Sequence, residues 1–169
     1  MSQEQQSPIN LTNPIYADFG KDGLKIQWKR SIQGRLYPDH HGVVEFGSDD
    51  RQFVILNRKK FHMVQFHFHH PSEHWVDGVQ MTFELHVVHQ NIDDGSRVVV
   101  GIFLEGTDKP AQRPLGIEWL SRAAVDDANT NAQHLNPMEW LPEKTNEYFR
   151  YEGSLTTEPY TEKDRKSVV

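Results

Sequence analysis

Histidine side chains are concentrated in one stretch of this sequence. The chain has 169 residues and ten histidines, and seven of the ten lie between His62 and His89. It has no cysteine, so imidazole and carboxylate groups are the side chains left to bind a metal ion. The clustering therefore predicts a metal site built mainly from histidine nitrogens.

Two of these histidines, His67 and His69, are spaced for one face of a β-strand. Successive side chains of a strand point to opposite faces, so His67, His69 and Gln65 would share one side. Phe66 and Phe68 would lie on the other side and anchor the strand in an apolar core. Two imidazoles at this spacing can reach a single ion, so the pattern predicts a strand with two ligands.

A second strand offers the third ligand. Residues 83–89 alternate in the same way, with Glu84, His86 and Val88 on one face. Asp77-Gly78 lies between the two segments and predicts a turn that returns the chain antiparallel to the first strand. His86 would then lie opposite the first two histidines.

The three candidate ligands match a particular kind of metal site. A catalytic zinc typically has three protein ligands and keeps an open position for water. Metal-binding imidazoles usually donate their second ring N–H to an outer acceptor, and Glu84 and Gln65 are spaced to accept such bonds. We therefore expect Zn²⁺ as the cofactor, with His67, His69 and His86 as its ligands.

The remaining histidines in and near this stretch have less specific positions. We interpret His62, His89 and His134 as core or surface residues, because a single histidine in a strand is more often a satisfied polar group than a ligand. His70 and His74 are close to the predicted ligands but do not share their alternation, so we expect them to support the site or pack against it.

A cupin-type metal site fits part of the same pattern. His67, His69 and Glu73, with Gly78 beyond them, resemble the first metal motif of the cupins, in which the glutamate is itself a ligand. The second cupin motif, a turn with glycine and proline that leads to histidine and asparagine, is not apparent downstream. A cupin-type metalloenzyme therefore stays open as a less favoured alternative.

The segments around these histidines predict one mainly β domain over residues 1–169. Short apolar or alternating runs recur between turn signals, and no repeat or linker divides the chain. Strands are expected over residues 23–28, 42–46, 53–57, 61–69, 81–89, 98–104 and 148–151, and one helix around residues 115–125.

Composition limits the partners of the chain. The formal net charge is −6, whereas surfaces that bind nucleic acids carry a basic excess. No apolar stretch approaches the roughly 18 residues of a membrane span, and the start of the chain lacks the basic and apolar regions of a signal peptide. We expect no nucleic-acid or membrane partner and a cytoplasmic location, with a periplasmic or secreted location as the alternative if a signal peptide was removed.

Six segments, in order, are closely similar to motifs of the α-class carbonic anhydrases. The segments are Gln6-Ser7-Pro8-Ile9-Asn10, Gln65-Phe66-His67-Phe68-His69, Ser72-Glu73-His74, Glu84-Leu85-His86-Val87-Val88-His89, Val99-Val100-Gly101-Ile102-Phe103-Leu104 and Tyr151-Glu152-Gly153-Ser154-Leu155-Thr156-Thr157. The resemblance implies a zinc lyase that interconverts carbon dioxide and bicarbonate through a zinc-bound hydroxide. It also implies a large, twisted, mostly antiparallel sheet with a few short helices.

The same resemblance gives roles to further residues. Thr156 matches the threonine that accepts a hydrogen bond from the hydroxide and donates its own to a carboxylate, here Glu73. Thr157 matches the hydroxyl that helps to hold bicarbonate, and His40 matches the proton-shuttle histidine, with His41 as an adjacent substitute. The apolar pocket for carbon dioxide is matched by Val88, Val99 and Leu155.

Both ends of the chain depart from the family pattern. The aromatic-rich segment before Gln6 is reduced to residues 1–5, and residues 163–169 depart from the family, with Lys166 at the position of a pocket tryptophan. We therefore expect a shortened member whose sheet is truncated at its C-terminal end. An unpaired edge and uncovered apolar surface favour a homodimer, with strand exchange between the two copies as one form of it.

Two functional hypotheses follow from this combination of motifs and departures. The first is an active zinc carbonic anhydrase, and the second is a noncatalytic carbonic-anhydrase-like binding or scaffold domain. The resemblance favours the first, because noncatalytic relatives typically lack a zinc histidine and this chain has all three.

Overall fold

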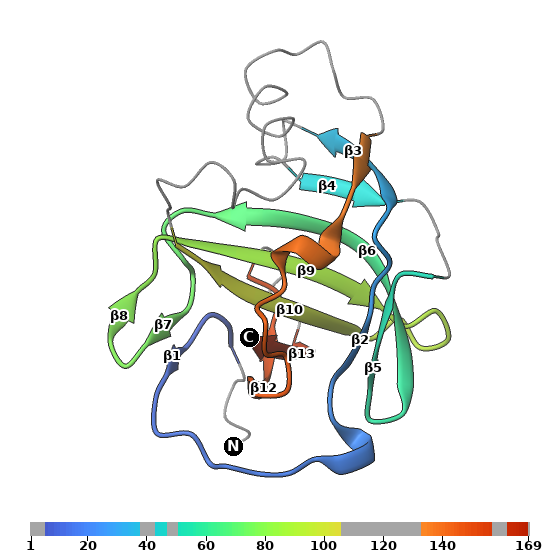
Figure 1. Ribbon diagram of the computed structural model, residues 1–169. Coiled ribbons are helices and arrows are strands. Elements are labelled where there is room, and N and C mark those ends of the chain that lie inside the picture. Colours follow the sequence, from blue (N-terminus) through green and yellow to red (C-terminus); the bar gives the residue numbers. More distant parts are fainter. Residues whose placement is uncertain (1–5, 38–42, 47–50, 106–132, 157–161, 169) are drawn as a thin grey trace.

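The described part of the chain is mostly β-strand (Figure 1). The computed structural model describes residues 6–37, 43–46, 51–105, 133–156 and 162–168. The strands are β1 (Asn10–Leu11), β2 (Lys25–Gln27), β3 (Ile32–Tyr37), β4 (Val43–Phe46), β5 (Phe53–Leu56), β6 (Lys59–His69), β7 (Trp75–Val76), β8 (Val79–Gln80), β9 (Phe83–Gln90), β10 (Arg97–Leu104), β11 (Gln133–Leu135), β12 (Phe149–Ser154) and β13 (Glu162–Val168), and the short 3-10 helices are η1 (Gly20–Asp22) and η4 (Pro137–Trp140). The expected helix around residues 115–125 lies outside the described residues.

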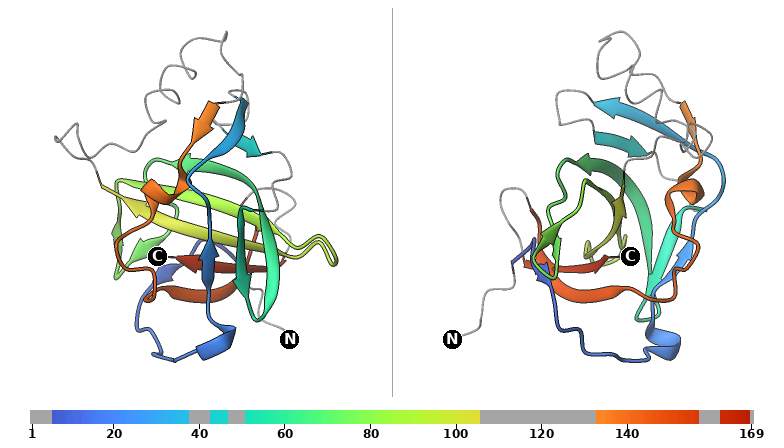
Figure 2. Two further views of the ribbon diagram at one scale, coloured as in Figure 1. Left: turned by 45° about the vertical axis from the view of Figure 1, so that its right-hand side comes forward. Right: turned by 60° about the vertical axis from the view of Figure 1, so that its left-hand side comes forward.

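Most of the strands form one ten-stranded sheet. Its main order is β11-β3-β4-β6-β9-β10-β13-β12, and β5 joins β6 while β2 joins β5. The pairings in this sheet are antiparallel except that of β10 with β13, which is parallel. Figures 1 and 2 show the sheet strongly curled, with β6, β9 and β10 side by side across its middle. The predicted fold class, mainly β and mostly antiparallel, is confirmed.

A β-bulge in β6 decides which face its side chains take. The register of β6 against β9 shifts between Met63 and Gln65, so Val64 is an extra residue in the ladder. Phe61 and Met63 before the bulge are buried in the core, and so is Phe66 after it. Because an inserted residue shifts the alternation by one, both halves of β6 can bury apolar side chains in the same core. Gln65 and the odd-numbered residues after it then occupy the opposite face.

An aromatic cluster fixes β6 from the core side. Phe66 is fully buried, and its ring centroid lies 4.6 Å from Trp140 of η4, 5.4 Å from Phe46 of β4 and 5.8 Å from Phe68. Edge-to-face and tilted ring pairs at these distances are favourable. The cluster therefore ties two strands and a helical turn to the face of β6 that lies opposite Gln65.

The neighbouring strands β9 and β10 are buried along most of their length. Residues 84–89 of β9 and residues 98–102 of β10 are all buried. A strand covered on both faces is typically a continuous apolar run, as in the segment 98–102. Polar side chains on β9 therefore need partners inside the protein, which makes Glu84, His86 and His89 informative.

The segment that departs from the family at the end of the chain forms β13. It runs parallel to β10, with Lys166 opposite Val99, and antiparallel to β12, with Lys166 opposite Tyr151. The sheet therefore continues through this segment, between β10 and β12. The alternation of apolar residues predicts no strand here, because most residues of the segment are charged.

The strand β3 is a second element that the apolar pattern does not predict. Gly34 interrupts it, and glycine weakens a strand pattern. A Cβ atom at Gly34 would lie 2.4 Å from Cγ1 of Val44 and 2.9 Å from Cε1 of Phe46. The close approach of β3 to β4 therefore requires glycine at this position.

A small three-stranded sheet, β1-β7-β8, lies beside the main one (Figure 1). Asp77 and Gly78 join β7 to β8 with φ angles of 47° and 80°, and the N–H of Gly78 donates to Oδ1 of Asn10 at 3.0 Å. The turn predicted at Asp77-Gly78 is thus confirmed. Within the described ranges, no helix has the length and apolar character needed to cross a membrane.

His89 is a core histidine held neutral by its surroundings. Its Nε2 accepts a hydrogen bond from Nε1 of Trp28 at 3.0 Å, and its Nδ1 lies 3.3 Å from the carbonyl oxygen of Val98. Burial lowers the pKa of His89 from 6.5 to about 3. The structural interpretation of His89 from the sequence agrees with this environment.

Replacing Phe66 with alanine should strongly destabilise the protein. The change removes a fully buried ring from the aromatic cluster and leaves a cavity, so we expect a loss of about 3–5 kcal/mol. Urea denaturation followed by circular dichroism measures the free energy of unfolding. Val79→Ala, at a residue that is 59% exposed, is the control and should change stability by less than about 0.5 kcal/mol.

The lowered pKa of His89 predicts a pH dependence of stability. The unfolded chain binds a proton near pH 6.5 that the folded protein excludes until about pH 3, so this stability is present above pH 6.5 and is lost as the pH falls toward 3. We expect His89→Gln to reduce the stability lost between pH 7 and pH 5 by about 2 kcal/mol relative to wild type. Urea unfolding at the two pH values tests this. Equal pH dependence in wild type and variant would contradict it, and His70→Gln, at an exposed histidine, serves as the control.

Candidate metal centre

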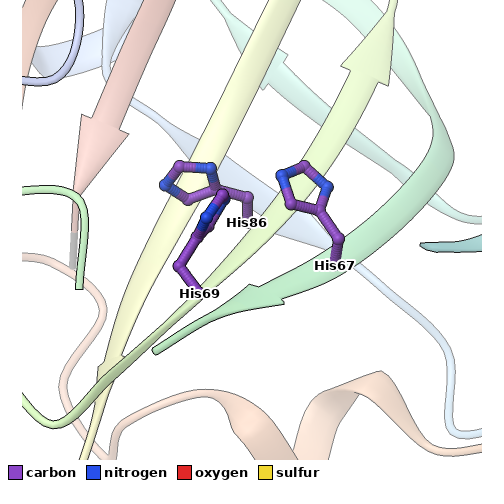
Figure 3. Close-up of side chains that lie close together, drawn as sticks. All are labelled: His67, His69 and His86. Carbon is purple, nitrogen blue, oxygen red and sulfur yellow. The ribbon is translucent and has the colours of Figure 1, made fainter. Parts of the chain in front are cut away.

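Three histidine side chains from two adjacent strands converge on one face of the sheet. His67 and His69 come from β6 and His86 from β9, and His67 lies directly opposite His86 in the ladder. Figure 3 shows the three rings gathered in one place. One nitrogen from each ring lies within 4.8 Å of the other two. The pairing of β6 with β9 therefore brings the predicted ligand set together.

Hydrogen bonds orient two of these rings. Nδ1 of His67 lies 2.8 Å from Oε1 of Gln65, and Nε2 of His86 lies 2.8 Å from Oε1 of Glu84. An amide oxygen and an ionised carboxylate oxygen accept hydrogen bonds but do not donate them, so these two ring nitrogens have the protons. The lone pairs able to bind a metal ion are then on Nε2 of His67 and Nδ1 of His86.

Glu84 is a fully buried carboxylate shared by two histidines. Its Oε1 lies 2.7 Å from Nδ1 of His74 and 2.8 Å from Nε2 of His86, and its Oε2 accepts the backbone N–H of His74 at 2.9 Å. Burial by itself would raise the pKa of this carboxyl, but hydrogen bonds from His74 and His86 outweigh burial and hold the pKa well below its usual range. Although His74, Glu84 and His86 are also close enough to hold an ion, the Glu84 charge is already engaged by the two imidazoles.

Glu73 lies beside the three-histidine cluster. Its Oε2 is 3.5 Å from Nε2 of His69 and 3.8 Å from Nδ1 of His86. Among the residues that the structure describes, this oxygen is buried and accepts no hydrogen bond. A carboxylate oxygen next to the cluster favours positive charge there. It also has capacity to accept a hydrogen bond from a hydroxyl group.

Apolar side chains continue the face of β9 that carries His86. Val88 follows His86 by two residues and lies opposite Val99 of β10. Both valines are buried, and Leu155, directly after β12, is partly buried. Val88 and Val99 thus form an apolar surface on the ligand face of the sheet.

The structure locates the remaining predicted site residues to different extents. Thr156 is partly buried and follows the end of β12 by two residues. Over the described ranges, no hydrogen bond joins Thr156 to Glu73. Thr157 and His40 lie outside the described residues, as does His41, so their roles stay predictions.

The histidines outside the ligand set have varied surroundings. His70 is exposed, and its Nδ1 lies 2.8 Å from the carbonyl oxygen of Thr82 while its ring stacks on Phe83. His62 lies near Phe53, with ring centroids 6.5 Å apart. His134 lies in β11, which pairs with β3. None of these three contacts joins its histidine to the metal cluster.

Three residues that support the cluster have no role in the sequence prediction. The hydroxyl of Tyr151 shares a hydrogen bond of 2.5 Å with Nε2 of His74 and another of 3.0 Å with Oγ of Ser7. Ser7 in turn exchanges hydrogen bonds with Ser154. Burial raises the pKa of Tyr151, so its hydroxyl stays protonated. All three belong to segments that match family motifs, and that match is the signal by which they could have been found.

These contacts define a class of protein. Three imidazoles on a rigid sheet, two of them fixed by outer acceptors and one flanked by a carboxylate, are typical of a site for a single metal ion with an open position. The donor set fits a divalent metal that prefers nitrogen ligands. The fold and the site therefore describe a candidate metalloenzyme.

Comparison with known proteins identifies the family. The chain belongs to the eukaryotic-type carbonic anhydrases, whose family model matches residues 1–164. It is 32% identical over 167 residues to a carbonic anhydrase of Pectobacterium atrosepticum and 39% identical over 162 residues to one of Nostoc sp.. The solved structure of the alpha-carbonic anhydrase of Photobacterium profundum matches with a TM-score of 0.80 and 28% sequence identity. The family match places the chain among carbonic anhydrases and not among cupins.

The chain is shorter than these relatives. It is covered over 98% and 94% of its own length by the Pectobacterium and Nostoc matches, but it spans 65% and 60% of those two proteins. The structural match covers 98% of this chain and 73% of the Photobacterium chain. The ligand strands β6 and β9 both lie within the matched residues.

Replacing His86 with alanine should abolish stoichiometric metal binding. Only two imidazoles would then remain, and Glu84 would lose one of its two ring N–H donors. Metal content after dialysis against Zn²⁺ or Co²⁺ and removal of excess ion measures the effect. We expect about one ion per chain in wild type and near none in the variant. His62→Ala, near Phe53, is the control and should bind as wild type does.

Proposed function

We propose that this protein catalyses the reversible hydration of carbon dioxide to bicarbonate and a proton, with zinc as its metal. The observation that supports the proposal most directly is the cluster of His67, His69 and His86 within a carbonic anhydrase fold. Zinc bound there would supply a water molecule that ionises near neutral pH. The activity of the longer relatives is extended here to a chain that spans about two thirds of their length or less.

The outer acceptors support this role by fixing the ligands. Gln65 and Glu84 hold the protons of His67 and His86 on the ring nitrogens turned away from the metal. The ionised Glu84 also makes the His86 imidazole a stronger electron donor. A neutral three-histidine set leaves the positive charge of the metal largely uncompensated, which favours ionisation of a water molecule at neutral pH.

Thr156 and Glu73 are proposed to orient the nucleophile. Oε2 of Glu73 lies beside His69 and His86 and has capacity to accept a hydrogen bond. If the Thr156 hydroxyl donates to Glu73, its oxygen must accept a hydrogen bond from the attacking water, because a hydroxyl has one proton. The nucleophile is then held with a lone pair directed at the substrate. Thr157 is proposed to hold the product bicarbonate.

The apolar residues are proposed to receive the substrate. Carbon dioxide is neutral and apolar, so it is held better by a dry wall than by a charged group. Val88 and Val99 lie side by side on the ligand face of β9 and β10, and Leu155 precedes Thr156. These three residues would keep water away from the reacting carbon while the nucleophile approaches from the metal side.

Thr156→Ala should separate metal binding from catalysis. Zinc content should stay near wild type, because the change removes no ligand, whereas kcat/KM for hydration should fall by roughly 100-fold. Stopped-flow assay of carbon dioxide hydration with a pH indicator measures this. Thr156→Ser keeps the hydroxyl and is the matched control, expected to retain most of the rate. A full rate in Thr156→Ala would show that the orienting role is wrong.

His40 is proposed as the proton shuttle. A histidine with an ordinary pKa near 6.5 can transfer protons at neutral pH. In weak buffer His40→Ala should lower turnover by roughly 10-fold, at the low end of what one general acid–base group supplies, and added imidazole should restore the rate. His41→Ala is the matched control. Loss of turnover in His41→Ala alone would move the role to His41.

Two further outcomes have their own readouts. Stoichiometric zinc without hydration activity in wild type would favour the noncatalytic binding or scaffold domain. The expected homodimer stays a prediction, and sedimentation velocity at micromolar concentration tests it directly.

A further inference from the structure

A continuous chain of hydrogen bonds leads from the metal ligand His86 to the start of the described chain. His86 bonds to Glu84, Glu84 bonds to His74, and Nε2 of His74 lies 2.5 Å from the hydroxyl of Tyr151. Tyr151 continues the chain to Oγ of Ser7 at 3.0 Å. Each intermediate group is thus fixed from both sides.

Ser7 also forms a two-way clasp with the end of β12. The backbone N–H of Ser154 donates to Oγ of Ser7 at 3.2 Å, and the backbone N–H of Ser7 donates to Oγ of Ser154 at 3.0 Å. Ser154 is fully buried and Ser7 is 9% exposed. These bonds therefore fix the position of β12 at Ser154, two residues before Thr156.

One side chain thus joins the two halves of the site. The Ser7 hydroxyl contacts Tyr151, which leads to the ligand His86, and Ser154, which leads to Thr156. A serine hydroxyl can donate one hydrogen bond and accept two, which is enough for both contacts. An alanine at this position would leave the buried N–H of Ser154 and the hydroxyl of Tyr151 short of a partner.

We propose that Ser7 is a positioning residue for the metal centre: through Tyr151, His74 and Glu84 it restrains the ring of His86, and through Ser154 it restrains Thr156. The part that concerns Thr156 rests on the proposed function, whereas the part that concerns His86 rests on metal binding alone. Ser7 itself touches neither the three-histidine cluster nor Thr156 in the bonds described above.

The test measures zinc affinity and zinc dissociation rate in the full chain. Outer-sphere partners of metal ligands change affinity by roughly 10–100-fold, so Ser7→Ala should weaken zinc binding by about 10-fold. Chelator competition gives the affinity, and transfer of zinc to a coloured chelator gives the rate. Tyr151→Phe keeps the ring but breaks the same chain, so it should produce a similar loss, and the double variant should lose little more than either single one.

A matched control separates positioning from general destabilisation. Asn91→Ala removes a buried side chain that bonds to the carbonyl oxygen of Lys60 and to the backbone of Asp93 and Asp94, in the turn between β9 and β10. It should lower the free energy of unfolding without changing zinc affinity. Wild-type zinc affinity in both Ser7→Ala and Tyr151→Phe would overturn the proposal, as would an equal loss in Asn91→Ala.

The hydration assay separates this proposal from the proposed function. Ser154→Ala removes one half of the clasp but leaves its backbone N–H to bond with Ser7, so we expect kcat to fall several-fold while zinc affinity stays near wild type. An inactive wild-type protein that binds zinc would refute the proposed function. The comparison of zinc dissociation rates among the variants would still decide the coupling to His86.

Discussion

The buried carboxylate of Glu84 is the interaction on which the site depends. It has no exposed surface, so its charge has to be balanced within the protein. His74 and His86 provide the balancing N–H groups, and in return their rings are held in one orientation. The same bonds thus stabilise a buried charge and set the direction of a metal ligand. Neither effect can be changed alone, because the loss of one imidazole leaves the carboxylate short of a partner.

The ligand face of the sheet was predictable because its signal is local. Alternation on β6 and β9 depends on neighbouring residues, and a turn at Asp77-Gly78 limits how the two strands can pair. The buried run of β10 is equally plain, since it is apolar throughout residues 98–102. The extra residue Val64 was not predictable, because nothing in the alternation marks where a strand changes its buried face.

Other features were missed because their causes lie far away in the sequence. Gly34 suggests an interrupted strand until β4 is seen to approach it too closely for a side chain. The charged segment 162–168 has no strand pattern of its own and is placed by pairing with β10 and β12. The supporting roles of Ser7 and Tyr151 depend on contacts between distant segments, so only the resemblance to a family could have indicated them.

The clasp between Ser7 and Ser154 joins residues 147 positions apart, and this separation affects how the protein is made. Contacts so distant in the sequence form slowly, because a long loop must close before they reward the ordering. During synthesis the strands of the three histidines leave the ribosome well before Ser154 does. A nascent chain could therefore assemble the ligand triad first and complete its outer support only after β12 has emerged, so early metal capture would occur at a looser site than the finished one.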